Sequence, residues 1–139
     1  MDEAKTYADF GIPGPAPCPS WCSGSHAGSH AGPARAVIFH GASAIGGGVL
    51  VDGNAVTFGM NWAERFADGA WQPPRGEDVT VFLQAGTDYI PVDATDRNMA
   101  GLAAIARLIS PDVDERVRQI GRLLKETHDT RQAGQDDAQ

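Results

Sequence analysis

Residues 17–40 hold most of the side chains in this sequence that can bind a metal ion. Both cysteines of the chain and three of its four histidines fall in this stretch, as Cys18, Cys22, His26, His30 and His40. From residue 10 to residue 51 the only formal charge is Arg35. Thiols and imidazoles gathered in a stretch without acidic side chains are typical of a metal-binding segment.

The spacing of these residues favours zinc. Cys18-x3-Cys22-x3-His26 places three ligands in one compact loop, and His40 follows a short apolar run that is typical of a strand. Zn²⁺ prefers a tetrahedron of nitrogen and sulfur ligands, and two thiolates with two neutral imidazoles balance its charge. We therefore predict a structural Zn²⁺ held by Cys18, Cys22, His26 and His40. His30 is the alternative fourth ligand, and it lies in a local echo in which AGSHAG follows SGSHAG.

Two enzymatic interpretations use the same residues. Cys22 can act as a nucleophile with His26 or His40 as its base, but such a pair leaves two of the four residues without a role. A catalytic zinc with three protein ligands and a bound water would need a carboxylate base from farther along the chain, such as Asp52 or Glu64. A site with four protein ligands uses the whole pattern, so we expect a protein that is not an enzyme.

Pro19 and Trp21 complete a Cys-Pro-x-Trp-Cys-x3-His motif that ends at His26, and His40-Gly41 follows an apolar strand. In this motif the sequence resembles a family of small actinobacterial and actinophage proteins of unknown function. Those proteins have a later His, a few strands and a C-terminal helix rich in Ala and Leu, to which MAGLAAIARLI at 99–109 is similar. The resemblance covers about residues 17–110 and implies the shared set Cys18, Cys22, His26 and His40. It implies no activity.

The composition is that of a small globular protein. With 139 residues, 42% of them hydrophobic, the chain is long enough to bury a core, and we assign residues 17–129 to a single α+β domain with its zinc loop at 17–40. Residues 1–16 are expected to form a flexible arm and residues 130–139 a disordered tail. Two cysteines without a signal-peptide pattern indicate the reducing cytoplasm, and no apolar run reaches membrane-spanning length. The net charge of −7 argues against nucleic-acid binding, because affinity for phosphates depends on Lys and Arg.

The pattern of apolar residues predicts strands in the middle of the chain. A short strand at 37–39 precedes a hairpin at Asp52-Gly53, where a type I′ turn needs two residues with positive φ. Alternation predicts further strands over 78–84 and 88–92. Residues 61–76, which include Trp62, Phe66 and Trp71, are expected to form a long irregular connection.

Two helices are predicted after the strands. Asp93 or Thr95 can cap the first, and Ser110 followed by a proline ends it and begins the second. In the first helix Met99, Leu102, Ala103, Ala106 and Ile109 share one face at helical spacing, whereas Ala104 and Leu108 lie roughly opposite. The predicted fold is α+β, with a small antiparallel sheet of about four strands, a C-terminal helical hairpin and an N-terminal Cys/His metal-binding loop.

These observations predict a zinc-binding module that engages an unidentified protein partner in an interaction or regulatory role. The alternatives are a small zinc-dependent hydrolase and a nucleic-acid-binding regulator. The second alternative would use the basic stripe Arg118, Arg122 and Lys125 of the last helix. Acidic residues lie between and beside these positions, which favours a solvated helix face over a phosphate-binding surface.

Overall fold

The computed structural model describes residues 7–14, 17–24, 26 and 29–137. Seven strands lie within this part of the chain: β1 (His30–Gly32), β2 (Arg35–Ala42), β3 (Val49–Val51), β4 (Asn54–Ala67), β5 (Ala70–Trp71), β6 (Val79–Ala85) and β7 (Asp88–Asp93). Two α-helices follow, α1 (Asp96–Ile109) and α2 (Pro111–Asp137), and two 3₁₀ turns are η1 (Tyr7–Phe10) and η2 (Gly76–Asp78). The fold is α+β as predicted, but the sheet is larger than the expected four strands.

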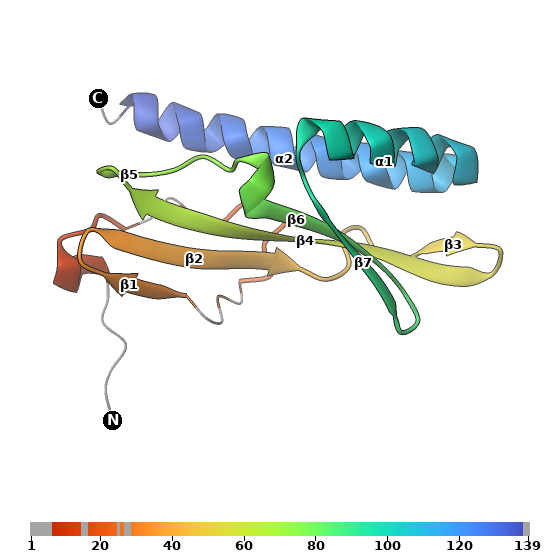
Figure 1. Cartoon of the computed structure of the whole chain (residues 1–139), viewed down its shortest axis with the longest axis horizontal. Coiled ribbons are helices and arrows are strands. Elements are labelled where there is room, and N and C mark those ends of the chain that lie inside the picture. The colour runs from red at the N-terminus through yellow and green to blue at the C-terminus, as the bar shows by residue number, and fades with distance from the viewer. Residues whose placement is uncertain (1–6, 15–16, 25, 27–28, 138–139) are drawn as a thin grey trace.

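Strand β4 is the centre of an antiparallel sheet (Figure 1). The strands follow the order β1-β2-β4-β6-β7, and β3 and β5 pair with the two ends of β4. In the register across the middle, His40 of β2 lies opposite Trp62 of β4, which lies opposite Val79 of β6. Three strands far apart in the sequence therefore bring one row of side chains together beneath the helices.

The prediction of an irregular connection over residues 61–76 is wrong. Residues 61–67 complete the 14-residue strand β4, and β5 forms a hairpin with its end. Alternate side chains of β4 point into the core, namely Phe58, Met60, Trp62, Glu64 and Phe66. The acidic side chain among them interrupts the apolar pattern in the sequence, which is why that pattern does not reveal the strand.

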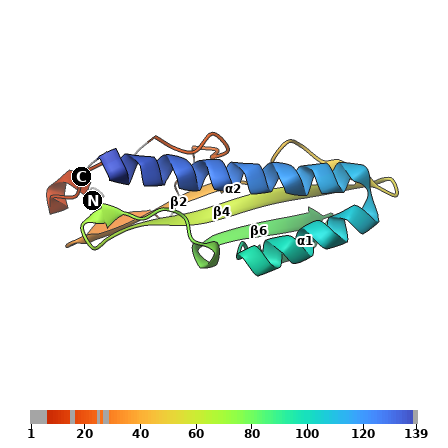
Figure 2. The same ribbon diagram turned by 90° about the horizontal axis from the view of Figure 1, so that it is seen from above.

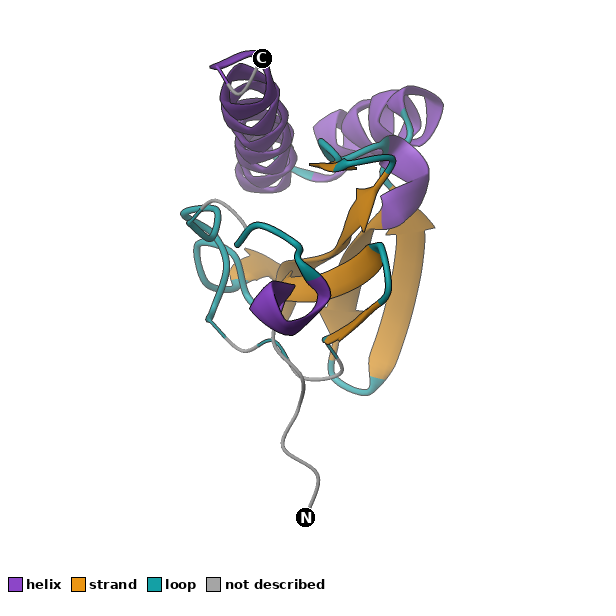
Figure 3. Cartoon of the chain, turned by 90° about the vertical axis from the view of Figure 1, so that its left-hand side faces the viewer, coloured by secondary structure: helices purple, strands orange, loops and turns teal. Residues whose placement is uncertain are grey.

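Both α-helices lie on one side of the sheet (Figures 1 and 3). Helix α2 runs along nearly the whole length of the strands, and α1 lies beside it over β6 (Figure 2). The helices pack on the sheet through a core that includes Phe58, Met60, Trp62, Val79, Val81, Ala106, Val113, Val117 and Ile120. Burial of this apolar face, more than helix propensity, stabilises the long α2.

Several local signals of the sequence are confirmed. Asp52 and Gly53 turn the β3–β4 hairpin with φ values of 48° and 77°. The Thr95 hydroxyl caps α1 by accepting a hydrogen bond from the Asn98 N–H at 3.2 Å. The Ser110 hydroxyl accepts from the Val113 N–H at 3.2 Å and so caps α2. Each cap satisfies a backbone donor that the first turn of a helix leaves without a partner.

Residues 130–137 belong to α2, which continues to Asp137, and so they do not form the tail predicted over 130–139. The last two residues of that prediction lie outside the described part of the chain. Thr127 and Arg131 are buried on its inner face, at 7% and 6% exposure. The composition of this segment is polar because its inward side chains make hydrogen bonds rather than apolar contacts. A search for apolar periodicity therefore does not predict this part of the helix.

Part of the predicted N-terminal arm is also packed. Ile12 is 4% exposed and contributes to a small second core with Phe66, beside Trp71. The Trp71 indole N–H donates to the Pro13 carbonyl at 2.8 Å. Residues 1–6 and 15–16 of the arm lie outside the described residues. In the part of the chain that the structure describes, no helix is long and apolar enough to cross a membrane.

Candidate metal centre

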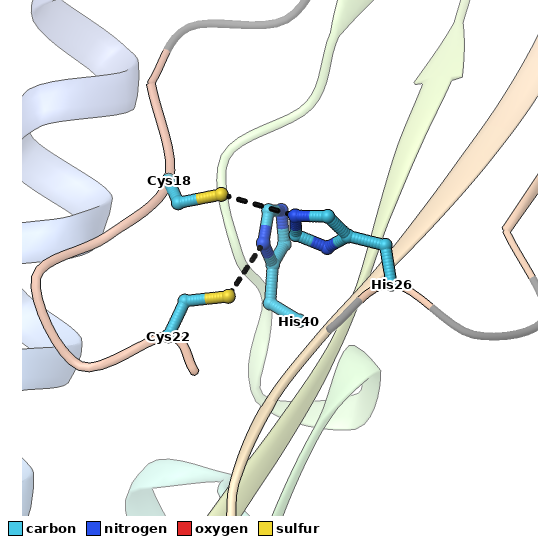
Figure 4. A group of neighbouring side chains, drawn as sticks. All are labelled: Cys18, Cys22, His26 and His40. Carbon is cyan, nitrogen blue, oxygen red and sulfur yellow. Dashed lines mark hydrogen bonds between the residues drawn. The ribbon is translucent and has the colours of Figure 1, made fainter. Parts of the chain in front are cut away.

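Cys18, Cys22, His26 and His40 come together at one point of the fold (Figure 4). One nitrogen or sulfur atom of each side chain lies within 4.8 Å of the corresponding atoms of the other three. The two cysteines project from the loop before the sheet, and their sulfur atoms face the two imidazole rings (Figure 4). The group can therefore hold a metal ion.

Backbone hydrogen bonds fix the cysteine loop against the sheet. The Cys22 N–H donates to the Pro19 carbonyl at 3.0 Å, which closes a tight turn between the two cysteines. The Ser23 N–H donates to the Gly41 carbonyl at 2.9 Å and attaches the loop to the end of β2. Gly24 has a φ of 88° and directs its N–H to the Cys22 sulfur at 3.4 Å. The Cys22 sulfur therefore has a backbone hydrogen-bond donor beside it, which would stabilise a thiolate.

Each imidazole presents one nitrogen to the cluster and uses the other elsewhere. His26 has its Nε2 atom 3.2 Å from the Cys18 sulfur, and its Nδ1 atom is 3.0 Å from the Phe39 carbonyl oxygen. His40 has its Nδ1 atom 3.5 Å from the Cys22 sulfur, and its Nε2 atom is 2.7 Å from Glu64 Oε1. A carbonyl or carboxylate that accepts the outer N–H fixes the tautomer in which the inner nitrogen can bind a metal.

Glu64 and Arg131 form a buried ion pair behind His40 that the sequence analysis did not predict. Glu64 is 0% exposed, and both of its oxygens accept hydrogen bonds from Arg131, at 2.7 Å from Nε and 3.0 Å from Nη2. Arg131 also donates from Nη1 to the Pro17 carbonyl at 2.9 Å, next to Cys18. The carboxylate that orients His40 is therefore neutralised by a guanidinium that also contacts the cysteine loop.

Aromatic rings cover the inner side of the cluster. Trp62 stacks on His40 with ring centroids 5.0 Å apart and planes inclined by 26°. The Arg131 guanidinium lies 5.4 Å from the centroid of the Trp62 ring, on its face, which is a favourable cation–π contact. Trp21, 9% exposed, meets His40 edge-on at 6.5 Å. The buried rings of Trp21 and Trp62 therefore shield one side of the centre from solvent.

The pKa of the Cys18 thiol is raised in this cluster. Burial raises the pKa of the Cys18 thiol, the neighbouring Cys22 raises it further, and Arg131 opposes both effects. A pair of thiolates this close is stabilised when a metal ion binds both, because the ion replaces their mutual repulsion with attraction.

Two of the separations between ligand atoms are close to those of a tetrahedral site. With metal–ligand distances of about 2.0–2.3 Å, the ligand atoms of a tetrahedron are about 3.3–3.8 Å apart. The two sulfur–nitrogen distances of 3.2 and 3.5 Å lie close to this range. Two sulfur and two nitrogen ligands are a donor set for a borderline-soft cation and not for Mg²⁺ or Ca²⁺, which prefer oxygen.

The other candidate residues lie outside the cluster. His30 begins β1, where it pairs with Val37 and is exposed, so it is not the fourth member of the group. Asp52 is in the β3–β4 turn. Glu64, which the sequence offered as a distant base, does lie beside the cluster, but His40 and Arg131 occupy its oxygens.

The Trp21 indole provides a test of how the loop is anchored. Its N–H donates to the buried Thr127 hydroxyl of α2 at 3.0 Å, and that hydroxyl donates to the Leu123 carbonyl at 2.7 Å. Thr127→Val keeps the shape but leaves the indole N–H without an acceptor, so we expect a loss of about 1–3 kcal/mol in the free energy of unfolding. Thr127→Ser keeps the hydroxyl and should lose less. Urea denaturation of the metal-loaded proteins measures both, and equal losses would show that the hydrogen bond does not matter.

The chain matches no model of a known protein family, no curated protein and no solved structure.

Proposed function

We propose that the protein is a non-enzymatic module in which a structural Zn²⁺, bound by Cys18, Cys22, His26 and His40, holds the N-terminal loop on the sheet. The observation that carries this proposal is the convergence of two sulfur and two nitrogen atoms within 4.8 Å of one another. Zinc is the ion for which this donor set and tetrahedral spacing are most common in proteins.

The outer contacts of the cluster support a structural rather than a catalytic metal. Four protein ligands fill a tetrahedron and leave no position for water or substrate, whereas catalytic zinc keeps one position open. A hydrolase would also need a base near the ion. Glu64 is the carboxylate that contacts a ligand, and it is fully buried in an ion pair with Arg131. A zinc-dependent hydrolase is therefore the less favoured function.

The contacts of the basic stripe likewise disfavour a nucleic-acid-binding regulator. Arg118 pairs with Asp114, Arg122 with Glu115, and Lys125 with Asp129, the last two at 2.8 Å. Phosphates would have to displace these carboxylates from a chain of net charge −7. We therefore keep the interpretation of a protein-binding or regulatory module. The cytoplasmic location and the resemblance to the actinobacterial and actinophage family stay predictions.

Metal analysis tests this proposal directly. Native mass spectrometry of the purified protein should show one zinc per chain, and elemental analysis should identify it. After exchange with Co²⁺, the visible spectrum should have the strong absorption of a tetrahedral site and sulfur-to-cobalt charge-transfer bands. That spectrum should not change on addition of azide or thiocyanate, because no ligand position is open. A protein purified without metal that also fails to bind Zn²⁺ or Co²⁺ would refute the site.

A further inference from the structure

The two ligands of the metal centre that can be oxidised lie together on one side of it. Both sulfur atoms project from the cysteine loop, and they are within 4.8 Å of each other (Figure 4). Cys18 is exposed to solvent, whereas Cys22 is half-buried. A metal ion keeps bound thiols deprotonated, and an accessible thiolate beside a second cysteine is the usual arrangement of a redox-sensitive pair.

The local backbone keeps the two cysteines within reach of a direct bond. The Cys22 N–H donates to the Pro19 carbonyl at 3.0 Å, which turns the chain back between them. A disulfide bond is about 2 Å long, so the two sulfur atoms need to approach by less than about 3 Å. The chain has only these two cysteines, so neither has another thiol of the same chain to pair with. Because both belong to one loop, the bond can form without any movement of the sheet.

The two imidazole ligands are attached to the opposite side of the centre. His40 lies in β2, and the Nδ1 atom of His26 is 3.0 Å from the Phe39 carbonyl oxygen of the same strand. A bound metal therefore connects the cysteine loop to β2, because the loop supplies the sulfurs and the strand holds the imidazoles. A disulfide would connect the loop only to itself. Oxidation thus removes the connection between loop and sheet without replacing it.

We propose that the metal centre is a redox switch, in which hydrogen peroxide converts Cys18 and Cys22 into a disulfide, the zinc ion leaves, and the cysteine loop detaches from the sheet. The switch rests on the proposed structural zinc and gives that site a regulatory role. A change of thiol state is a local event that can act on a larger element when that element has two arrangements. Here the element is the cysteine loop, docked with zinc and released without it.

The reaction has two steps, and Cys18 takes the first because solvent reaches it. Its thiolate attacks one oxygen of the peroxide, the O–O bond breaks, and the departing hydroxide takes up a proton to give water. The Cys22 thiolate then attacks the Cys18 sulfur, the S–S bond forms, and the second oxygen leaves as water after protonation. Two electrons pass from the sulfurs to the peroxide, which is reduced to two molecules of water. Two neutral imidazoles remain for Zn²⁺, and they lack the thiolate charge that retained it.

The cysteine loop has few other contacts to hold it once the metal has left. Hydrogen bonds anchor it through the Ser23 N–H, the Trp21 indole and the Pro17 carbonyl. Trp21 is also its one large apolar side chain. These contacts are too few to offset the conformational entropy of an ordered loop, which the metal otherwise offsets. Release would uncover His40 and Arg131, which are 3% and 6% exposed while the loop is docked.

Peroxide treatment of the full zinc-loaded chain tests the switch. A colorimetric chelator follows the released zinc, thiol titration counts the remaining cysteines, and peptide mapping locates the new bond. We expect one zinc released per chain, loss of both thiols, and a Cys18–Cys22 disulfide within the monomer. Dithiothreitol and added Zn²⁺ should restore the starting protein. Zinc retained with both thiols intact, a disulfide between two chains, or oxidation to sulfinic acid would overturn the proposal.

Tryptophan fluorescence tests the release of the loop. Trp21 is 9% exposed, so its emission should shift to longer wavelength when the loop detaches. Trp21→Phe is the control, because it leaves the other two tryptophans in place and should abolish the shift. A wild type that forms the disulfide and loses zinc without any shift would overturn the detachment.

A chelator separates the failure of the switch from the failure of the zinc site. Chelation should release the metal and shift the fluorescence while both thiols stay free, and Zn²⁺ alone should reverse it. After peroxide, Zn²⁺ alone should not reverse the change, because the disulfide must first be reduced. A chain that never binds zinc would refute the metal site itself. A chain that binds zinc and keeps it in peroxide would refute only the switch.

Discussion

Removal of the metal ion is expected to lower the free energy of unfolding by at least about 5 kcal/mol, since a structural zinc contributes about 10–16 kcal/mol in finger peptides. The cysteine loop has little apolar surface of its own, and without a cation the two sulfur atoms are left with only the imidazole nitrogens and the Gly24 N–H as partners. Urea denaturation before and after treatment with a chelator measures the change. Hydrogen exchange should show the loss of protection first at the N–H groups of Cys22 and Ser23, whose acceptors hold the loop in place.

The ligand variants should reproduce the effect of the chelator. Cys22→Ser removes one of the two sulfurs and should lose both zinc and most of the stabilisation. His30→Ala is the matched control, because His30 is an exposed histidine in the neighbouring strand β1 and not a member of the cluster. It should retain one zinc and nearly the full stability. If chelation leaves the urea midpoint of the wild type where it was, the metal does not hold the fold together.

Glu64→Gln is expected to cost about 3–5 kcal/mol, because it keeps the volume of the side chain but leaves the buried Arg131 guanidinium without a counter-charge. Arg131→Met should cost a similar amount by leaving Glu64 unpaired. The double variant should lose clearly less than the sum of the two, since each single change already breaks the same pair. Denaturation of the metal-loaded proteins gives the three values. Simple additivity would mean that the two residues act independently.

Glu64→Gln should also weaken the binding of the metal ion. The Glu64 carboxylate fixes the outer nitrogen of His40, so its loss should weaken zinc binding by about 10–100-fold in a competition titration. Glu77→Gln is the control, since Glu77 and its partner Arg75 are both more than 60% exposed. It should change stability by less than about 0.5 kcal/mol and zinc affinity not at all.

The four members of the cluster could be predicted because their residue types and spacing form a local pattern in the sequence. Three of them fall within nine residues, from Cys18 to His26, and His40 ends an apolar run, so residue type and spacing alone select the set. The choice of His40 over His30 agrees with the structure because His40 is on the buried side of β2, whereas His30 begins an edge strand.

The residues behind the cluster could not be predicted, because the signal for them is not local. Glu64 and Arg131 are separated by 67 positions, and each is an ordinary charged residue in its own neighbourhood. Glu64 interrupts the apolar pattern of β4, and Arg131 lies in a polar segment that composition assigns to a tail. The same two residues therefore explain two of the errors in the predicted fold, the missed strand over 61–67 and the missed end of α2. From the sequence alone, each member of a buried ion pair is read as a solvated side chain, because charged residues are mostly exposed.

The contacts between the cysteine loop and α2 have a consequence for biosynthesis. The indole of Trp21 binds the hydroxyl of Thr127, which is 106 positions later in the chain. The carbonyl of Pro17 binds the guanidinium of Arg131, which is 114 positions later. At about 5–20 residues per second, a ribosome needs several seconds or more to make the intervening chain. During that interval the two thiols have left the exit tunnel without their final neighbours. A nascent chain is thus open to premature oxidation or to the wrong ion for as long as the last turns of the helix are still being translated.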